Sequence, residues 1–441
     1  MLLVAQKGRE QEVFRVFEKW GLDAVEVGIV TADNVLRVRE HGKIVAEIPN
    51  PALTDEAPLY KRPLARWEPP ISREMPENIQ FGKKEDFTAD LKQLLGSPNI
   101  CGKRWVWQQY DHMVQTNTVE APGAGDAGVI RIKDSQRGLA MALDGSGRWC
   151  YLDPKLGAMH AVAEAARKVA CSGATPVAAT NCLNFGNPEK PHIMWQFSQA
   201  IDGIAKACEE LEIPITGGNV SMYNETLGEG IYPTPVLGVV GILEDVHKAA
   251  KMHFAAPGRA IVLLHSGETG DLVDAESEFG SSEYAKEVLG ELWGYPPELD
   301  LEKEAALQRA VVDLIAQGMV ESVHDCADGG LAVALAEKAF VKGIGARVNV
   351  KSRRLPAEFV LFGEDSSRIL LTCDPAQVSG IKEVAEQFGL AADVLGETGG
   401  GSLEISLDGK VVVSAEVSEL SSTCESALES ALRAEPEAVA V

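Results

Sequence analysis

A repeat between the two ends of the chain constrains its fold more than any other feature of the sequence. The aligned pairs are residues 1–4 with 369–372, 17–22 with 385–390, 25–28 with 393–396 and, after a slip of one residue, 41–45 with 408–412. Segments of one chain that repeat in sequence are expected to repeat in structure. Residues 1–48 are therefore predicted to copy the last part of the final domain.

The two copies differ in what precedes them. The second is entered through a polar loop, Phe362 to Arg368, whereas the first begins directly on its strand at Met1. The first domain is thus expected to be truncated. We also expect the chain to be the later part of a longer protein, or one half of a split protein.

Hydrophobic periodicity predicts a compact α/β unit over residues 2–48. Its predicted elements are a strand at Leu2–Ala5, a helix at Glu10–Trp20 closed by Gly21, and strands at 24–30, 35–39 and 43–48. Residues 49–76 are rich in proline and show no period, so they predict an extended linker that packs on a surface.

Helical and strand-like segments are interspersed in the remainder of the chain. Helices are predicted at 86–95, 104–113, 157–172, 192–211, 301–317, 331–340 and 377–388, and strands at 127–132, 138–143, 176–180, 213–216, 236–243, 259–264, 322–324 and 368–373. The predicted organisation is a partial domain at 1–48, a linker at 49–85, domains at 86–255 and 256–430, and a tail at 431–441 that frays.

Composition excludes several classes of protein. The formal net charge of −24 argues against nucleic acid as the main partner, because binding to a phosphate backbone relies on Lys and Arg. No apolar run approaches the ~20 residues of a membrane helix, and no signal peptide is visible. The eight scattered cysteines include no Cys-x-x-Cys pair, which argues against zinc and predicts reduced thiols in the cytoplasm.

Four loops with polar side chains follow predicted strands, and ligands gather where such loops converge. Their carboxylates and amides suit Mg²⁺, which takes oxygen ligands and usually bridges substrate phosphates. The sequence contains neither the Gly-x-x-x-x-Gly-Lys-Ser/Thr of a P-loop nor a Gly-x-Ser-x-Gly elbow. The loops are Asp144–Gly147, Asn181–Asn187, Gly217–Asn224 and Asp325–Gly330.

The loop that begins at Gly217 is the strongest candidate for a phosphate site. Gly217-Gly218 is interpreted as a turn whose bare backbone lets N–H groups approach a phosphate closely. Asn219, Ser221 and Asn224 then supply neutral polar groups, and an amide oxygen can reach the magnesium ion bound to that phosphate. An ordinary turn is the alternative interpretation of Gly-Gly-Asn alone.

Histidines and cysteines near these loops have two interpretations. His324, beside Asp325, is a candidate general base, but a hydrogen-bonded structural role suits it at least as well, as it does His112 and His160. Cys182 and Cys326 have no basic neighbour that would favour a thiolate, so both are expected to be small buried residues.

Longer motifs resemble those of the phosphoribosylformylglycinamidine synthase family, in its stand-alone PurL form. They are Tyr151–Pro154, Asn181–Glu189, Ile193–Phe197, Gly218–Glu225, Tyr232–Val236 and His324–Leu331. The resemblance extends over essentially the whole chain. It implies two AIR-synthetase-like halves in the order A1–B1–A2–B2, of which this chain is similar to the end of B1 followed by A2 and B2. The implied fold is α+β, with mixed sheets packed with helices and preceded by a truncated B-type domain.

The resemblance also implies an activity. Members of that family make formylglycinamidine ribonucleotide from formylglycinamide ribonucleotide, ATP and ammonia, which comes from a glutaminase subunit by way of a small accessory subunit. ATP phosphorylates the amide oxygen, ammonia displaces the phosphate, and magnesium offsets the phosphate charge. The roles implied for this chain are ATP contact for Gly218 and Asn181, magnesium ligation for Asn219 and substrate contact for Ser221.

This chain departs from the family pattern at one position of the implied site. The family has Asp where Asn181 stands, and an amide brings no charge to ATP or metal. The family's catalytic histidines lie in A1, so no catalytic acid or base is assigned here.

Two hypotheses of different classes follow. The first is an ATP-dependent carbon–nitrogen ligase half of purine biosynthesis, located in the cytoplasm, that needs a separate N-terminal half. The second is a non-catalytic scaffold that holds a structural nucleotide or none and docks other purine-synthesis subunits. A stand-alone AIR synthetase fits poorly, because the chain runs partial B, A, B.

Overall fold

The computed structural model describes residues 1–267 and 272–434 and divides the chain into two units, Met1–Lys61 and Arg62–Val441. The part of the predicted tail beyond residue 434 lies outside the described residues.

Unit 1 consists of helix α1 (Glu10–Lys19), a hairpin of strands β1 (Val35–Glu40) and β2 (Lys43–Pro49), and the single turn α2 (Asn50–Leu53). Helix α1 ends as predicted at Gly21, whose φ of +66° is a conformation that glycine adopts without strain. None of residues 1–61, all of which are described, is buried.

Two of the four strands predicted within residues 2–48 do not form. The segments Leu2–Ala5 and Ala24–Val30 were expected as strands, but among the described residues neither pairs with another strand. A strand needs a neighbour for its backbone N–H and C=O groups, and both segments remain extended chain with exposed apolar side chains such as Val27 and Ile29.

The repeat itself is visible in the structure. The β1–β2 hairpin corresponds to β16 (Ser402–Leu407) and β17 (Lys410–Glu416). Both hairpins turn through a residue of positive φ followed by glycine, His41-Gly42 in one and Asp408-Gly409 in the other. Both also shift register at the same place, after Val38 and after Ile405. The predicted correspondence of these two segments is therefore confirmed.

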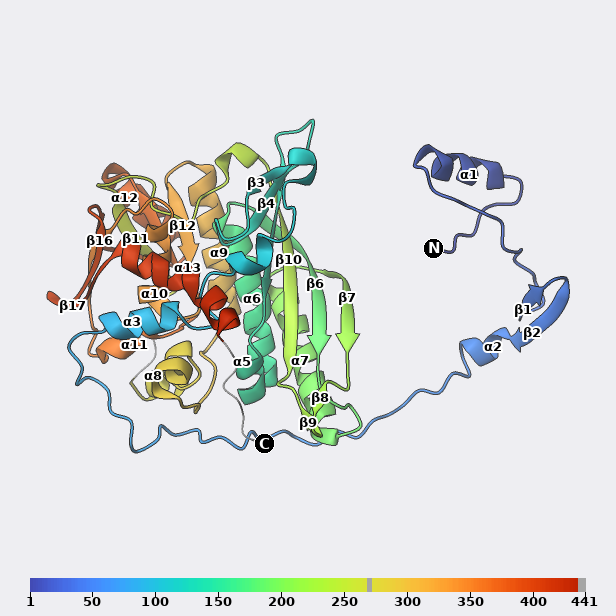
Figure 1. The fold of residues 1–441 in the computed structure, drawn as a ribbon, viewed down its shortest axis with the longest axis horizontal. Coiled ribbons are helices and arrows are strands. Elements are labelled where there is room, and N and C mark those ends of the chain that lie inside the picture. The colour runs from blue at the N-terminus through green and yellow to red at the C-terminus, as the bar shows by residue number, and fades with distance from the viewer. Residues whose placement is uncertain (268–271, 435–441) are drawn as a thin grey trace. The chain divides into compact units, whose positions relative to one another are not determined.

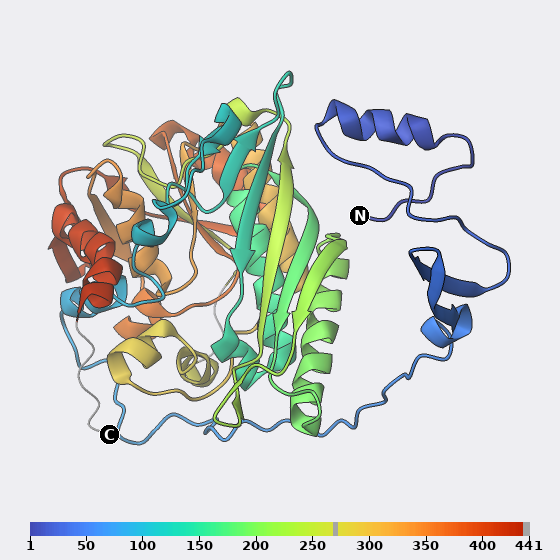
Figure 2. The ribbon, with the colours of Figure 1, turned by 45° about the vertical axis from the view of Figure 1, so that its right-hand side comes forward.

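The first sheet of unit 2 has six strands in the order β3-β4-β5-β10-β6-β7. Their bounds are β3 Thr118–Glu120, β4 Gly128–Arg131, β5 Gly138–Asp144, β6 Thr175–Asn184, β7 Ile215–Ser221 and β10 Thr234–Leu243. Helices α6 (Pro154–Cys171) and α7 (Pro191–Glu210) pack together on one face, as Figures 1 and 2 show. The other face exposes apolar side chains, including Leu143 and Val177.

The second sheet has seven strands in the order β12-β14-β11-β15-β13-β16-β17. Its other strands are β11 Ala260–His265, β12 Ser322–Asp325, β13 Ala346–Val350, β14 Arg368–Cys373 and β15 Ala391–Thr398, and its helices are α9 Leu301–Ala316, α10 Gly330–Phe340, α12 Val378–Gln387 and α13 Val417–Arg433. Helix α6 of the first sheet contacts α9 and β12, so the two sheets share one interior. The predicted α+β class with mixed sheets is confirmed.

Shorter elements connect these layers. They are helices α3 Thr88–Leu95, α4 Arg104–Trp107, α5 Gly147–Leu152, α8 Leu272–Phe279 and α11 Ala357–Phe362, the hairpin β8 Glu225–Thr226 and β9 Glu229–Gly230, the 3-10 turns Val114–Thr116, Val246–Lys248 and Pro375–Gln377, and the π-turn Ala285–Leu289. The helix predicted at Arg104–Met113 forms only as α4. Its apolar side chains Trp105 and Val106 stay exposed, so no burial supports a longer helix.

The segment that leads into unit 2 lies along its surface. Trp67 stacks on His192, meets Tyr151 edge-on and donates a hydrogen bond from Nε1 to the Tyr151 carbonyl. Further along, Phe81 packs against Phe279 and Phe359. Within the described residues, no helix combines the length and apolar character that crossing a membrane requires.

Candidate functional site

The residues predicted to bind ATP, metal and substrate lie on two neighbouring strands. Strands β6 and β7 pair in parallel, which places Asn181 beside Gly218, Cys182 beside Asn219, and Asn184 beside Ser221. The interpretation of Gly217-Gly218 as a turn is wrong, because both glycines lie inside β7.

Close packing against Asn181, and not a turn of the backbone, explains the glycine at position 218. A Cβ atom at this position would lie 2.1 Å from Oδ1 of Asn181 and 2.7 Å from its Cγ. The absence of a side chain at Gly218 is thus what allows Asn181 to lie over the neighbouring strand. At Gly217 a Cβ would meet nothing within 4 Å.

The pleat of the sheet separates these residues onto two faces. Asn181 stands opposite Leu237 of β10 in the antiparallel register, so it points to the face that α6 and α7 cover. Successive side chains of a strand alternate, so Cys182 points to the open face, together with its neighbour Asn219. The Nδ2 atom of Asn219 lies 4.0 Å from the Cys182 sulfur. Ser221 shares the face of Asn219 and hydrogen bonds to the Asn224 side chain.

We call Cys182, Asn184, Asn219 and Ser221 the polar row. It is an open and neutral surface: Asn219 and Cys182 are exposed, and the expectation that Cys182 is buried is wrong, whereas Cys326 is buried as expected. Of two surface cavities, one has Glu278 in its wall and the other has Lys248. No residue of the polar row lines either cavity. Mg²⁺ prefers carboxylate and phosphate oxygens. An amide such as Asn219 can therefore serve only as one ligand beside a phosphorylated molecule.

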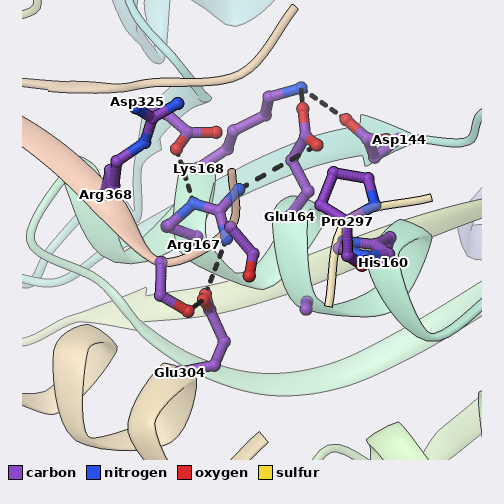
Figure 3. Close-up of polar contacts among 12 residues, drawn as sticks. Asp144, His160, Glu164, Arg167, Lys168, Pro297, Glu304, Asp325 and Arg368 are labelled. Atoms are coloured by element: carbon purple, nitrogen blue, oxygen red, sulfur yellow. Dashed lines mark hydrogen bonds and ion pairs between the residues drawn. The ribbon is translucent and has the colours of Figure 1, made fainter. Parts of the chain in front are cut away.

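A second polar region was missed by the sequence interpretation. It lies between the two sheets of unit 2 and centres on Glu164, Arg167 and Lys168 of α6, all in a mostly buried helix (Figure 3). The Arg167 Nη1 atom lies 2.9 Å from Glu304 Oε1, and its Nε donates to Asp325 Oδ1. The Lys168 ammonium lies 2.8 Å from Glu164 Oε1 and also contacts Asp144 Oδ2. We call these six residues the charged cluster.

The pKa values in the charged cluster follow from burial and pairing. Burial and the nearby Glu164 carboxylate raise the pKa of Asp144 well above its usual value. Burial opposes ionisation of Glu164 as well, but Lys168 and Arg167 outweigh it and lower the pKa of Glu164 to about 2. Burial raises the pKa of Asp325 to about 6 despite its bond to Arg167. The cluster is therefore held by internal ion pairs that join α6 to β5, α9 and β12.

His324 is a structural residue and not a free general base. Its Nδ1 lies 2.6 Å from Asp126 Oδ1, and its Nε2 lies 3.0 Å from Glu337 Oε2. Burial lowers the pKa of His324, but the two carboxylates outweigh it and raise the pKa to about 10. A protonated imidazole with both nitrogens engaged cannot accept a proton. His160 is likewise engaged, donating from Nε2 to the Pro297 carbonyl.

Two of the four predicted loops meet in the charged cluster, and the other two meet at the polar row. Asp144 and Asp325 end β5 and β12 and are joined through Lys168 and Arg167, whereas Asn181 and Gly218 are direct neighbours. The sequence does contain a signal for the charged cluster, because its α6 residues lie in a helix rich in alanine. Charged side chains must be paired where such a helix is buried.

Comparison with known proteins assigns both sheets. The family model for the AIR synthase related protein N-terminal domain matches residues 124–243, and the model for the corresponding C-terminal domain matches residues 256–408. The chain belongs to the AIR synthase related family. These ranges contain the polar row and the charged cluster, so both lie in family domains.

Curated relatives within this family are PurL subunits. Phosphoribosylformylglycinamidine synthase subunit PurL of Moorella thermoacetica is 46% identical over 422 residues, covering 95% of this chain and 56% of the relative. The PurL of Caldanaerobacter subterraneus subsp. tengcongensis is 43% identical over 415 residues, covering 94% of this chain and 55% of the relative. The chain is thus homologous to PurL, and it spans about half the length of the curated relatives it matches.

Solved structures show the same fold at lower identity. Thermotoga maritima PurL complexed with ATP matches with a TM-score of 0.60 and 19% identity, over 76% of this chain and 52% of that one. The same protein complexed with FGAR matches with a TM-score of 0.58 and 19% identity, over 76% of this chain and 53% of that one. PurLQS from Thermotoga maritima matches with a TM-score of 0.59 and 20% identity, over 76% of this chain and 52% of that one.

Proposed function

We propose that this chain is the C-terminal part of formylglycinamidine ribonucleotide synthase, an ATP-dependent carbon–nitrogen ligase of purine biosynthesis. The observation that carries the proposal is the homology to PurL over 95% of the chain at 46% identity. The substrates would be ATP and formylglycinamide ribonucleotide, in keeping with the ligands named for the Thermotoga maritima protein. The cytoplasm is the proposed location.

The polar row is the proposed ligand surface. Asn219 and Ser221 share the open face of the sheet, so one ligand can reach both. Asn219 would offer its amide oxygen to Mg²⁺ and Ser221 its hydroxyl to the substrate, while the exposed backbone of Gly218 contacts ATP. Bound Mg²⁺ would neutralise phosphate charge during transfer. Asn181 points to the opposite face, and we propose that it acts on ATP through Gly218, over which its side chain lies.

The whole reaction would need other polypeptides. No residue of this chain is assigned as the catalytic acid or base, and ammonia would come from a glutaminase subunit by way of a small accessory subunit. We propose that the missing groups come from the half of PurL that this chain does not span.

Unit 1 supports the need for a partner half. By the repeat, Leu2–Ala5 corresponds to β14 and Ala24–Val30 to β15, whose ladder partners are β11, β12 and β13. Unit 1 contains no counterpart of those three strands among its described residues. A polypeptide that supplied them would bury the exposed apolar side chains of Val27 and Ile29.

Reconstitution tests this function. The chain would be mixed with a polypeptide covering the N-terminal half of the Moorella thermoacetica relative, and formylglycinamidine ribonucleotide formation would be measured with ATP, Mg²⁺ and ammonia. Turnover in the mixture that falls when Asn219 is replaced by Ala supports the proposal. A folded complex without turnover, or turnover indifferent to Asn219→Ala, contradicts it.

A scaffold is the second candidate, and one observation favours it. Asn181 replaces the expected carboxylate, and the polar row itself carries no charge. A scaffold would form the complex and leave turnover unchanged in the Asn219→Ala variant. The same assay therefore separates the two functions.

A further inference from the structure

Unit 1 and the second sheet of unit 2 match one another element by element. The repeat aligns residues 17–22 with 385–390, and the same alignment places α1 opposite α12, each of which has 10 residues. The hairpin strands β1 and β2 have the same lengths as β16 and β17. The second sheet therefore shows which neighbours the segments of unit 1 are shaped to meet.

The strands that unit 1 lacks alternate, in the second sheet, with those to which its segments correspond. Leu2–Ala5 corresponds to β14, which lies between β12 and β11, and Ala24–Val30 corresponds to β15, which lies between β11 and β13. Strand β1 corresponds to β16, which pairs in parallel with β13. Within the described residues of unit 1, no strand corresponds to β11, β12 or β13. Both extended segments thus lack a neighbour on each side.

Apolar positions that are exposed in unit 1 are buried in the second sheet. Leu2 is 83% exposed, whereas its counterpart Leu370 is 0% exposed. Val27 is 79% exposed, and its counterpart Leu395 is 8% exposed. An extended segment with unpaired backbone groups and exposed apolar side chains is a template for pairing with another polypeptide.

Gly28 indicates most directly that a strand is missing beside Ala24–Val30. Its counterpart Gly396 lies between β11 and β13, where a Cβ would lie 2.0 Å from the Arg347 carbonyl oxygen and 2.9 Å from Val348 Cα. Only glycine fits where another backbone approaches so closely. At Gly28 a Cβ would meet nothing within 4 Å, so unit 1 by itself gives no packing reason for the glycine.

Helix α1 has an apolar side that matches a buried one. The side chains of α12 that are buried pack in one core with α9; they are Ile381, Val384 and Ala385. The three counterparts in α1 are also apolar, and none of them is buried; they are Val13, Val16 and Phe17. The missing neighbour of unit 1 therefore includes a helix in the place of α9 as well as three strands.

We propose that unit 1 docks onto the half of a PurL subunit that this chain does not span, and that Leu2–Ala5 and Ala24–Val30 become strands by interleaving with three strands of that partner. The curated relatives are matched over about half of their length, so their other half is long enough to supply these elements. The inference rests on the proposed function for the identity of the partner, but docking itself requires no catalysis. Because each segment lies between two partner strands, the two polypeptides complete this sheet together and do not meet as finished domains.

The test measures docking without ATP or substrate, so a complex that forms as proposed but has no turnover contradicts the function and not this inference. The full chain would be tagged and co-expressed with a polypeptide covering the N-terminal half of the Moorella thermoacetica relative. Gly28→Val places a side chain where the partner strand should approach. Glu26→Val, the matched control, places the same side chain where the counterpart Val394 is 46% exposed.

The expected result is a one-to-one complex in which the backbone amides of Ala24–Val30 exchange hydrogen about 100-fold more slowly than in the chain alone. Gly28→Val should weaken the complex by about 10- to 100-fold, and Glu26→Val should leave its affinity unchanged. The melting temperature of the chain alone should not change in Gly28→Val, because its new side chain meets no neighbour there.

Three outcomes would overturn the inference. The first is a complex in which the amides of Ala24–Val30 exchange as fast as in the chain alone, and the second is equal affinity of Gly28→Val and Glu26→Val. The third is self-association of the full chain that Gly28→Val abolishes, because a second copy would then be the partner. If the separate halves form no complex, the two substitutions are compared in one polypeptide that joins the halves. A lower melting temperature for Gly28→Val there supports the inference, and equal values overturn it.

Discussion

The polar row lies on the first sheet of unit 2, whereas the charged cluster joins the two family domains, and the groups of the two regions differ in what they are bonded to. Asn219 of the row is exposed, neutral and without a charged partner in the described structure. Arg167 of the cluster is 3% exposed and is bonded to Glu304 and Asp325. Groups left unpaired at a surface are available to a ligand, whereas buried ion pairs chiefly hold elements together. We therefore propose that the row binds a ligand and that the cluster stabilises the fold.

Breaking the cluster should have the largest effect on stability. Arg167→Met leaves the buried carboxylates of Glu304 and Asp325 without their cation, which typically costs about 3–5 kcal/mol. Urea unfolding of the full chain measures this cost. The exposed Arg309→Met on α9 is the control and should stay within about 0.5 kcal/mol. A cost for Arg167→Met as small as that of the control would contradict a stabilising role.

Alkaline pH should destabilise the fold by weakening the contacts of His324 with Asp126 and Glu337. The pKa of His324 is raised to about 10 in the folded chain, so its contribution is complete below the unfolded value of 6.5 and is lost as pH rises towards 10. The free energy of unfolding should fall by at most about 1.4 kcal/mol per pH unit in that window. His324→Gln should remove this slope; a slope that persists in the variant would assign it to other groups.

Adding a methyl group at Gly218 should lower the free energy of unfolding by less than the loss of the Arg167 guanidinium does. Gly218→Ala places a Cβ against the Asn181 amide and should destabilise the chain by about 1–2 kcal/mol. Gly217→Ala, which meets nothing within 4 Å, is the matched control and should be close to neutral. Adding Asn181→Ala to Gly218→Ala should restore stability. Equal effects of the two glycine substitutions would refute the close packing of Asn181.

Asn219→Ala should leave stability almost unchanged. The side chain is exposed, so the free energy of unfolding should move by no more than about 0.5 kcal/mol. Thermal unfolding without ligand measures this change. A loss comparable to that of Arg167→Met would mean that the row, like the cluster, is structural.

The sequence predicted those elements whose periodicity is local. Helices α6, α7 and α9 and strands β5 and β10 lie close to their predicted positions, and the strands predicted at 35–39 and 43–48 form the β1–β2 hairpin. Local patterns failed where long-range contacts decide. Gly217-Gly218 resembles a turn, but its pairing with β6 makes it part of a strand.

The charged cluster shows the same limit for side chains. Arg167 meets Glu304 and Asp325, which lie more than 130 residues away along the chain, and no spacing rule connects them. The segments Leu2–Ala5 and Ala24–Val30 show the converse case. Their apolar pattern is that of strands, but a strand forms only where a neighbour completes its hydrogen bonds.

Calorimetric titration of Mg²⁺–ATP tests the division between row and cluster most directly. The full chain, combined with the N-terminal half of a PurL relative, would be titrated as the native protein, as Asn219→Ala and as Lys206→Gln. We predict that the native protein binds, that the affinity of Asn219→Ala is about tenfold lower, as expected for one lost polar contact, and that the control is unchanged. Equal affinity of the native protein and Asn219→Ala would contradict the assignment of ligand binding to the polar row.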